Sequence, residues 1–254
     1  MNNNCITVLA DKNYIHFFEK LHNDIREVGK YTGDIVLLTD RRTNCSKIRK
    51  INDKKIIIAR FDKIKFSREA NKELNKIPSG RNKSKPFQWH KINLFDNYFK
   101  QWNYIFYLDI NMKIRGDINE ILKLGKKGIL YAPFDAYPNL DWKLGSQFNT
   151  KSKTYELLKQ KYNLDNPKYF QTGILFFDSN LIEKNTKDNL IKLVEKFPIS
   201  KTNEQGIMNL YFIYEKNVFS RFPVEISNDI TYSYWRIRDR NSIITKRDIY
   251  EFEK

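Results

Sequence analysis

The sequence predicts an α/β protein: a single Rossmann-like domain whose central sheet is mixed but mostly parallel and is flanked by helices. Residues 34–40 form a continuous apolar run bounded by two aspartates, and continuous rather than alternating apolarity indicates a strand buried on both faces. The apolar residues of 14–28 recur at spacings of three and four, which is typical of a helix. Further short apolar runs lie at 55–59, 104–108, 129–132 and 173–177. Strands and helices therefore alternate along the chain, as in a doubly wound sheet.

The chain opens with a strand, a helix and a second strand. Residues 5–10 are a short apolar run that ends before the polar Asp11, and the helix over 14–28 follows it. The strands at 34–40 and 55–59 come next. Together these elements form the βαβ start that is expected of a parallel sheet.

The second part of the chain begins with a polar and basic segment, 67–85, which contains Pro78 and Gly80. We expect a helical turn and a mobile loop there, because proline and glycine interrupt regular structure. The α/β pattern resumes directly afterwards, so we treat residues 1–254 as one domain with a C-terminal extension at 228–254. The spacing of apolar residues predicts helices over 87–99, 154–162, 180–197 and 203–214.

The composition excludes several classes of protein. Of the 254 residues, 41% are hydrophobic and 15% aromatic, which is enough to build a core and rules out a disordered chain. The 2 cysteines are too few for a disulfide framework or a zinc site of four cysteines, and with only 3 histidines we expect no His-rich metal centre. No apolar run reaches the roughly 18–20 residues that a transmembrane helix needs, and the N-terminal residues lack the basic start of a signal peptide. We therefore expect a cytoplasmic protein.

The net charge of +16 leaves two interpretations open. A strongly basic surface favours anionic partners, such as phosphates or an acidic membrane to which the protein would bind peripherally. Alternatively, the lysines reflect a compositional bias and form only a solvated surface. The charged residues are spread through the apolar segments rather than grouped in a block, so we expect no specific nucleic-acid partner.

Polar residues directly after a strand are candidates for a site, because ligands of open α/β sheets bind beyond the carboxyl ends of the strands. Asp109 and Asn111 follow the aromatic strand at 104–108. Two hard oxygen ligands at this spacing can both reach a Mg²⁺ or Mn²⁺ that also holds a diphosphate. The alternative is that both residues only form the turn after the strand.

Six segments of the chain, in order and with sensible spacing, resemble the retaining nucleotide-sugar glycosyltransferases of family 8, the type of glycogenin and of bacterial lipopolysaccharide galactosyltransferases. Each segment alone is a weak signal, but together they are fairly specific. The resemblance implies the GT-A fold and a UDP-sugar donor. The six segments are 8–14, 87–95, 107–111, 130–135, 169–177 and 203–209.

The resemblance also implies roles for individual residues. The tyrosine of the first segment, Tyr14, offers a ring that can stack on uracil, and Lys91 brings positive charge to the donor. The implied metal ligands for Mn²⁺ or Mg²⁺ are Asp109 and Asn111. The implied donor-binding residues are Leu9, Ala10, Asp11, Tyr14, Lys91, Asp109, Ile110 and Asn111. The implied catalytic residues, around the transferred sugar and the acceptor hydroxyl, are Asp135, Gln171, Glu204 and Gln205.

Three of these residues depart from the pattern of the family. Asn111 stands in place of a second aspartate, so the metal site loses a negative charge, and we expect metal binding that is weak and depends on the nucleotide. Gln171 replaces an asparagine and Glu204 an aspartate. Each is one methylene longer, which alters the sugar pocket and leaves the identity of the donor sugar open.

The C-terminal part departs further. The family has a histidine ligand for the metal near its C-terminus, but no histidine follows His90 in this sequence. Arg236, Arg238 and Arg240 lie there instead. Guanidinium groups bind phosphate in a bidentate manner, so these arginines could neutralise the diphosphate. The alternative is a basic surface extension.

The leading functional interpretation is a retaining glycosyltransferase that moves a hexose-type sugar from a UDP-sugar to an acceptor hydroxyl. A glycan, a lipid-linked sugar and a protein side chain, including the chain's own tyrosines, all stay open as acceptors, and a homodimer is an option. The first alternative is a catalytically degenerate protein that binds a nucleotide sugar or a glycan on the same fold. The second is an electrostatic nucleic-acid-binding protein, which only basic charge and dispersed aromatics support.

Overall fold

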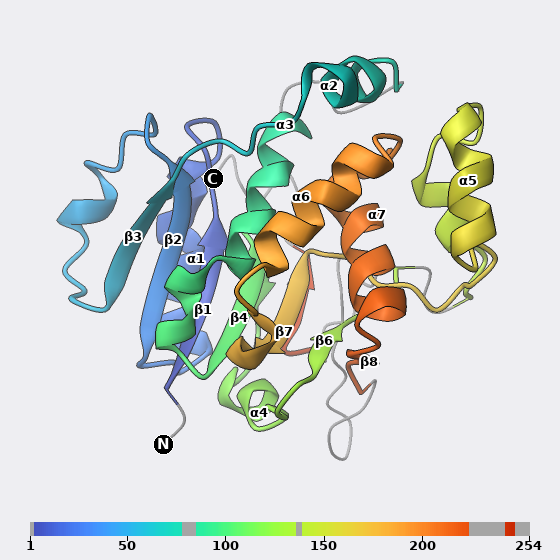
Figure 1. The fold of residues 1–254 in the computed structure, drawn as a ribbon. Helices are drawn as coiled ribbons and strands as arrows, with labels where there is room; N and C mark the ends of the chain where they lie inside the picture. The colour runs from blue at the N-terminus through green and yellow to red at the C-terminus, as the bar shows by residue number, and fades with distance from the viewer. Residues whose placement is uncertain (1–2, 78–84, 136–138, 224–241, 247–254) are drawn as a thin grey trace.

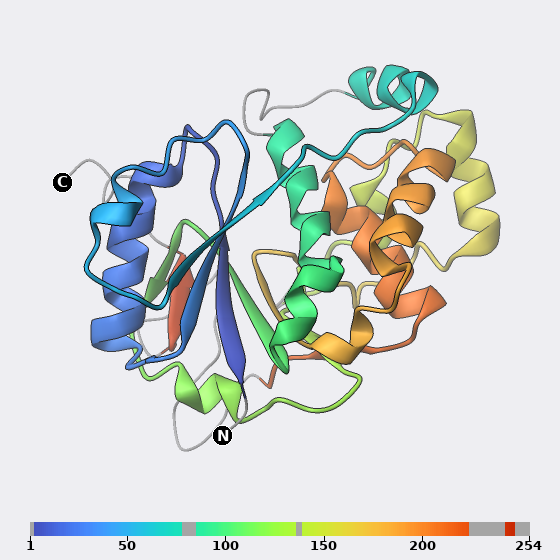
Figure 2. The ribbon, with the colours of Figure 1, turned by 60° about the vertical axis from the view of Figure 1, so that its left-hand side comes forward.

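The computed structural model describes residues 3–77, 85–135, 139–223 and 242–246, and it has three layers (Figure 1). The helical segment that follows the first strand packs on one face of the central sheet, and several later helices cover the other face. Figure 2 shows this layering edge-on, with the N-terminal helix on one side of the sheet. In the described part of the chain, no helix has the length and apolarity that crossing a bilayer requires.

Seven strands form the central sheet in the order β3-β2-β1-β4-β7-β6-β8. The pairs β1–β2, β1–β4, β2–β3 and β6–β8 are parallel, whereas β7 runs antiparallel to both β4 and β6. The sheet is therefore mixed and mostly parallel, as the sequence predicts. Its strands are β1 (Asn4–Leu9), β2 (Asp34–Asp40), β3 (Ile56–Phe61), β4 (Tyr104–Asp109), β6 (Leu130–Ala132), β7 (Ile174–Asp178) and β8 (Phe219–Arg221).

A second sheet contains two strands, β5 (Met112–Ile114) and β9 (Ile244–Lys246), paired antiparallel. Met112 lies opposite Lys246, and Ile114 lies opposite Ile244. This part of the predicted C-terminal extension is therefore tied to the chain directly after Asn111. The arginines at 236, 238 and 240 lie outside the described residues.

The helices agree with the predicted periodicities in position but are more segmented. The α-helices are α1 (Phe18–Asn23), α2 (Arg68–Asn75), α3 (Lys85–Gln88), α4 (Asn119–Leu122), α5 (Lys153–Lys161), α6 (Thr186–Lys196) and α7 (Glu204–Asn209). Tighter 3₁₀ segments are η1 (Ile15–Phe17), η3 (Ile48–Lys50), η4 (Trp89–Phe95), η5 (Asn97–Gln101), η6 (Leu144–Gln147) and η7 (Ser179–Leu181), and wider π turns are η2 (Asp24–Val28) and η8 (Leu210–Glu215).

Side-chain capping explains several of these boundaries. The helix predicted over 87–99 is interrupted at Asp96, whose carboxylate accepts the backbone N–H of Tyr98 at 3.0 Å and starts a new turn. Within the polar segment 67–85, the hydroxyl of Ser67 accepts the N–H of Ala70 and caps α2. Residues 78–84, where a mobile loop is predicted, lie outside the described residues.

The hydrophobic core has two halves, one on each face of the sheet. Ile105 and Tyr107 of β4 belong to the half under η4, α6 and α7, whereas Phe106 and Leu108 belong to the half under α1. Successive strand residues point to opposite faces, so a strand buried on both faces is apolar throughout. This explains the continuous apolar runs of the sequence and leaves the strand ends as the place for polar groups.

Candidate active site

The candidate site lies where β4 ends and β7 begins. Because these two strands are antiparallel, the carboxyl end of β4 meets the start of β7, and the N–H of Asp109 donates to the carbonyl of Gly173 at 2.8 Å. On the other side of β4, Leu9 at the end of β1 is the register partner of Asp109. Residues from three separate parts of the sequence therefore meet at one edge of the sheet.

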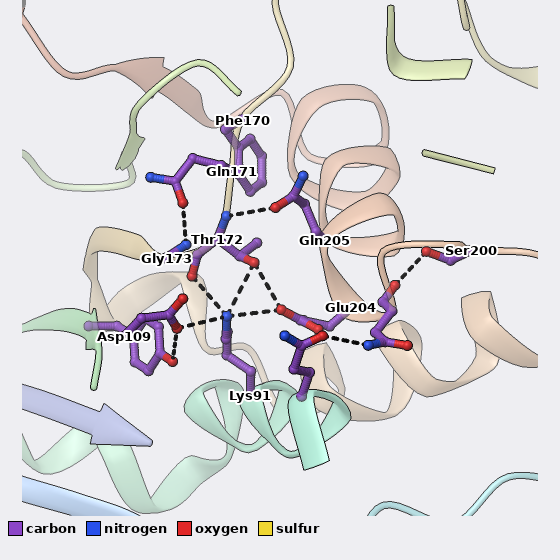
Figure 3. A network of polar contacts seen from close by, with 12 residues as sticks. Lys91, Asp109, Phe170, Gln171, Thr172, Gly173, Ser200, Glu204 and Gln205 are labelled. Atoms are coloured by element: carbon purple, nitrogen blue, oxygen red, sulfur yellow. Dashed lines mark hydrogen bonds and ion pairs between the residues drawn. The ribbon is translucent and has the colours of Figure 1, made fainter. Parts of the chain in front are cut away.

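Lys91 is the centre of a buried polar cluster (Figure 3). Its Nζ lies 2.9 Å from Glu204 Oε1 and 3.2 Å from Asp109 Oδ1. It also donates to the carbonyl of Thr172 at 3.0 Å and to the Thr172 hydroxyl at 3.3 Å. The Lys91 and Glu204 side chains are only 4% and 3% exposed, while that of Asp109 is 37% exposed. Asp109 is therefore the member of the cluster that faces the solvent.

The cluster carries one positive and two negative charges. Burial alone would lower the pKa of Lys91, but the charges of Asp109 and Glu204 hold that pKa above its usual value. Burial raises the pKa of the Glu204 carboxyl, although the charge of Lys91 opposes this. The Tyr107 hydroxyl donates to Asp109 Oδ1 at 2.5 Å, and burial followed by the charge of Asp109 raises the pKa of Tyr107. Lys91 is thus held fully protonated, with a net negative charge around it.

The segment before β7 places two amide side chains beside this cluster. The N–H of Thr172 donates to Gln205 Oε1 at 3.2 Å, and the N–H of Gly173 donates to Gln171 Oε1 at 2.5 Å. A Cβ atom on Gly173 would lie 2.7 Å from Gln171 Oε1 and 3.1 Å from Asp109 Oδ2. Any larger residue at position 173 would therefore displace the Gln171 amide from its present position.

The start of α7 is strained. Asn203, the residue before the helix, has a φ of 52° and a ψ of −123°. Residues other than glycine rarely adopt this backbone conformation. Two hydrogen bonds hold it: the Ser200 hydroxyl donates to the Asn203 carbonyl at 2.6 Å, and Asn203 Nδ2 donates to Gln88 Oε1 at 2.6 Å. This turn sets the position of Glu204 and Gln205, which follow directly.

Three polar atoms at the site are buried and have no hydrogen-bond partner in the described part of the chain. They are Glu204 Oε2, Gln171 Nε2 and Asn111 Oδ1. Buried polar groups in folded proteins are nearly always paired. Unpaired acceptors and a donor in one region are therefore available to a polar ligand such as a sugar.

The N-terminal residues with predicted donor-binding roles begin at Leu9, the register partner of Asp109. Ala10 is buried and its carbonyl accepts the Thr39 hydroxyl at 2.6 Å. The carboxylate of Asp11 accepts the backbone N–H of Asn13 at 2.9 Å and Asn13 Nδ2 at 3.2 Å, so it stabilises the turn itself. Tyr14 is 39% exposed, and its ring is accessible for stacking.

The predicted metal ligands offer few donors. Asp109 Oδ1 is engaged by Lys91 and by Tyr107, whereas Asn111 Oδ1 is buried without a described partner. Within residues 3–77, 85–135, 139–223 and 242–246, no group of three or more His, Cys, Asp and Glu side chains could hold a metal ion. Magnesium is often held by one or two protein ligands together with substrate phosphates. The residues therefore fit an ion that the phosphates of a nucleotide help to bind.

Sequence analysis did not identify Gln147, which contacts two of the predicted catalytic residues. Gln147 at the end of η6 accepts Gln205 Nε2 at 2.8 Å through its Oε1. Its Nε2 lies 3.2 Å from the Tyr169 hydroxyl and 3.4 Å from Asp135 Oδ2. Gln147 thus connects Asp135 with Gln205. A lone glutamine in an irregular segment gives no local signal that could have revealed this role.

The mixed sheet, with a charged cluster at the strand ends beside its antiparallel strand, defines a fold of the GT-A glycosyltransferase type. The chain belongs to Glycosyl transferase family 8, because the model of that family matches residues 5–222. The family predicted from the six segments is therefore confirmed. No curated protein sequence matches the chain.

Three solved glycosyltransferases have a similar fold. The bifunctional glycosyltransferase WbbM in its apo form has 20% identity and a TM-score of 0.61, over 90% of this chain and 40% of that one. The galactosyltransferase LgtC, in complex with donor and acceptor sugar analogs, has 14% identity and a TM-score of 0.62, over 96% of this chain and 86% of that one. Apo GlyE of Streptococcus pneumoniae TIGR4 has 16% identity and a TM-score of 0.53, over 87% and 45%. At these identities the likeness concerns the fold, and this chain spans less than half of WbbM and GlyE.

Proposed function

We propose that this chain is a retaining glycosyltransferase that moves a hexose-type sugar from a UDP-sugar to an acceptor hydroxyl. The observation that carries the proposal is the buried cluster of Lys91, Asp109 and Glu204 next to polar atoms that lack described partners. Membership of family 8 supports the same activity. The cluster lies at the strand ends, where α/β folds bind their ligands.

The nucleotide part of the donor would bind along the end of β1. The exposed ring of Tyr14 would stack on uracil. The ribose would bind next to Leu9, Ala10 and Asp11. Since Leu9 is the register partner of Asp109, the diphosphate would then reach Asp109, Ile110 and Asn111. The resemblance to the family supplies the order of groups along this edge, and the register of Leu9 with Asp109 supports it.

The sugar would bind among Asp135, Gln171, Glu204 and Gln205. Sugar hydroxyls would donate to Glu204 Oε2 and accept from Gln171 Nε2, the two buried atoms without described partners. Gln205 is fixed by hydrogen bonds at both ends of its amide. A rigid amide oxygen beside the anomeric carbon would stabilise the positive charge that develops there.

Breaking the glycosyl–phosphate bond leaves negative charge on the departing diphosphate. In a retaining transfer the acceptor attacks from the side on which the diphosphate leaves, so a phosphate oxygen can take the acceptor's proton. No strong protein base is then required. Lys91 would hold Asp109 and Glu204 in place for this step, since its Nζ contacts both carboxylates. A glycan, a lipid-linked sugar or a protein side chain would each supply a suitable hydroxyl.

We also propose that Asp109 and Asn111 hold Mn²⁺ or Mg²⁺ weakly and only with the nucleotide present. When bound, such an ion would offset charge on the diphosphate. The support is the buried Asn111 Oδ1 without a described partner, together with the exposed part of the Asp109 carboxylate.

The test is a thermal-shift panel of nucleotide sugars followed by a UDP-release assay. A UDP-sugar should raise the melting temperature, because ligand binding stabilises the native state, and a GDP-sugar should not. Asp109→Asn should abolish UDP release. Asp165→Asn, which changes an exposed carboxylate paired with Lys143, should leave it intact. Equal stabilisation by UDP- and GDP-sugars would contradict the proposed binding of uracil at Tyr14.

A non-catalytic binding protein is the second candidate, favoured by the capture of Asp109 Oδ1 by Lys91 and Tyr107. It predicts that UDP-sugars stabilise the chain but are neither hydrolysed nor transferred. UDP release above the Asp109→Asn background would exclude it.

A further inference from the structure

Gln147 lies outside the predicted site residues, yet both its backbone and its side chain are hydrogen-bonded to segments that carry the site. It is buried at the end of η6, and its carbonyl accepts the N–H of Lys201 at 2.7 Å. Its side chain contacts Gln205, Asp135 and Tyr169. Backbone and side chain together therefore join the loop after β6 to the segment that leads into α7.

One backbone donor fixes the direction of every hydrogen bond in this chain of contacts. The N–H of Thr172 can only donate, so the atom of Gln205 that it meets must be Oε1. Gln205 Nε2 then faces Gln147 at 2.8 Å, and the atom of Gln147 that receives it must be Oε1. Gln147 Nε2 is left to donate to Asp135 Oδ2 and to the Tyr169 oxygen.

All donors in this series thus run from the backbone toward the Asp135 carboxylate. Each bond polarises the next, so the series strengthens the hold on both amides. The Tyr169 hydroxyl lies at the same end, where burial and then the charge of Asp135 raise its pKa. Asp135 is therefore surrounded by donors and held as an acceptor.

We infer that Gln147 is a positioning residue of the transferase, which fixes the amide of Gln205 and the carboxylate of Asp135 in one geometry around the donor sugar. This inference rests on the proposed function. The inference goes beyond the proposed function because it assigns a role to a residue outside the six segments that resemble the family. Of its two hydrogen bonds in the described part of the chain, the Gln205 amide would keep the one with Thr172 without Gln147, and Asp135 would lose a donor.

Two variants separate the two arms of this series. Gln147→Leu removes both arms. Gln147→Glu keeps an acceptor for Gln205 Nε2 but removes the donor to Asp135. Because Gln147 Nε2 lies 3.4 Å from Asp135 Oδ2, the new carboxylate would lie next to the carboxylate of Asp135. At low pH a proton shared by the two carboxylates replaces the lost donor, whereas at high pH both are charged and repel.

The experiment measures UDP release from the UDP-sugar that stabilises the wild type best, between pH 5 and 8. For Gln147→Leu we expect kcat to fall by about 10- to 100-fold, the effect of misplaced reacting groups, with KM changed less than about threefold. For Gln147→Glu we expect a kcat near that of the wild type at pH 5 and a steep fall in kcat toward pH 8. The pH profile of the wild type should lack this fall. Gln101→Leu, which alters an exposed glutamine bonded to the Tyr98 carbonyl, is the matched control and should match the wild type.

Three results would overturn the inference. The first is kcat within twofold of the wild type for both Gln147 variants at every pH. The second is a Gln147→Glu profile parallel to the wild type at a reduced rate, because that indicates a merely structural residue. The third is a wild type that releases no UDP from any UDP-sugar, which refutes the proposed function itself and removes the basis of the inference. Melting temperatures of all variants show whether each one folds.

Discussion

Replacement of Lys91 by methionine tests the buried cluster most directly. Lys91 Nζ forms ion pairs of 2.9 and 3.2 Å with Glu204 and Asp109 and donates to Thr172. Methionine fills a similar volume without charge, so Lys91→Met leaves two carboxylates without their cation. Breaking a buried ion pair in this way costs about 3–5 kcal/mol of unfolding free energy. For a domain of this size, such a loss lowers Tm by about 6–20 °C.

The pH dependence of this loss has a definite sign. Burial raises the pKa of Glu204, and the charge of Lys91 opposes that rise, so without Lys91 the pKa rises further. A carboxyl with a raised pKa in the folded state favours folding while it is protonated and loses that contribution as the pH rises through the folded-state pKa. The deficit of Lys91→Met should therefore be largest at pH 8 and shrink toward pH 5. Adding Glu204→Gln should restore part of it.

Urea unfolding of the wild type and the variants at several pH values measures these changes. Lys143→Met is the control, since Lys143 pairs with Asp165 at 3.1 Å with both side chains largely exposed. Exposed pairs contribute only about 0–1 kcal/mol. A Lys91→Met deficit below about 1 kcal/mol that stays constant from pH 5 to 8 would refute the buried cluster.

Four further outcomes are expected. Tyr14→Ala should weaken UDP-sugar binding by about 1–3 kcal/mol in calorimetry through lost stacking, with Tm unchanged because the ring is 39% exposed. Asn111→Asp should tighten Mn²⁺ binding, measured calorimetrically with UDP present, because it restores a negative charge; equal affinity would remove Asn111 from the metal site. Asn203→Ala should be less stable than Asn203→Gly by about 1–2 kcal/mol in urea, since both lose the bond to Gln88 and only alanine opposes a φ of 52°. Burial tends to raise the pKa of Asp53, but hydrogen bonds from His22 and Arg26 lower this pKa from 3.8 to about 2. The stability that Asp53 contributes is therefore present above pH 4 and lost as the pH falls toward 2. Asp53→Asn should make the free energy of unfolding less dependent on pH in that window.

The strands with the clearest sequence signal are those buried on both faces. Their continuous apolar runs, such as 34–40 and 104–108, leave a local signal. The strands at 112–114, 219–221 and 244–246 have only three residues each. The strand at 130–132 is equally short, but a continuous apolar run marks it, whereas the other three contain charged or polar residues and give no such local pattern.

The site divides in the same way. Asp109 and Asn111 could be singled out because a polar residue at a strand end stands out against an apolar run. Gln147 could not, because its importance comes from a backbone N–H at residue 172 and a carboxylate at residue 135. Likewise, the sequence suggested that Asp109 binds an ion, and it did not reveal that Lys91 already occupies one of its oxygens.

The pairing of β5 with β9 has a consequence for the order of folding. Arg115 Nε donates to the Thr245 hydroxyl across 130 positions of sequence, and closing so long a loop costs entropy before any contact repays it. The strands β1, β2 and β3 can assemble earlier, because the register partners Cys5 and Asp34 are only 29 positions apart and Ile35 and Ile56 only 21. The stretch immediately after Asn111 therefore gains its neighbour late. During refolding, tryptophan and backbone signals of the sheet should recover first, and the capacity to retain a nucleotide should follow with a lag.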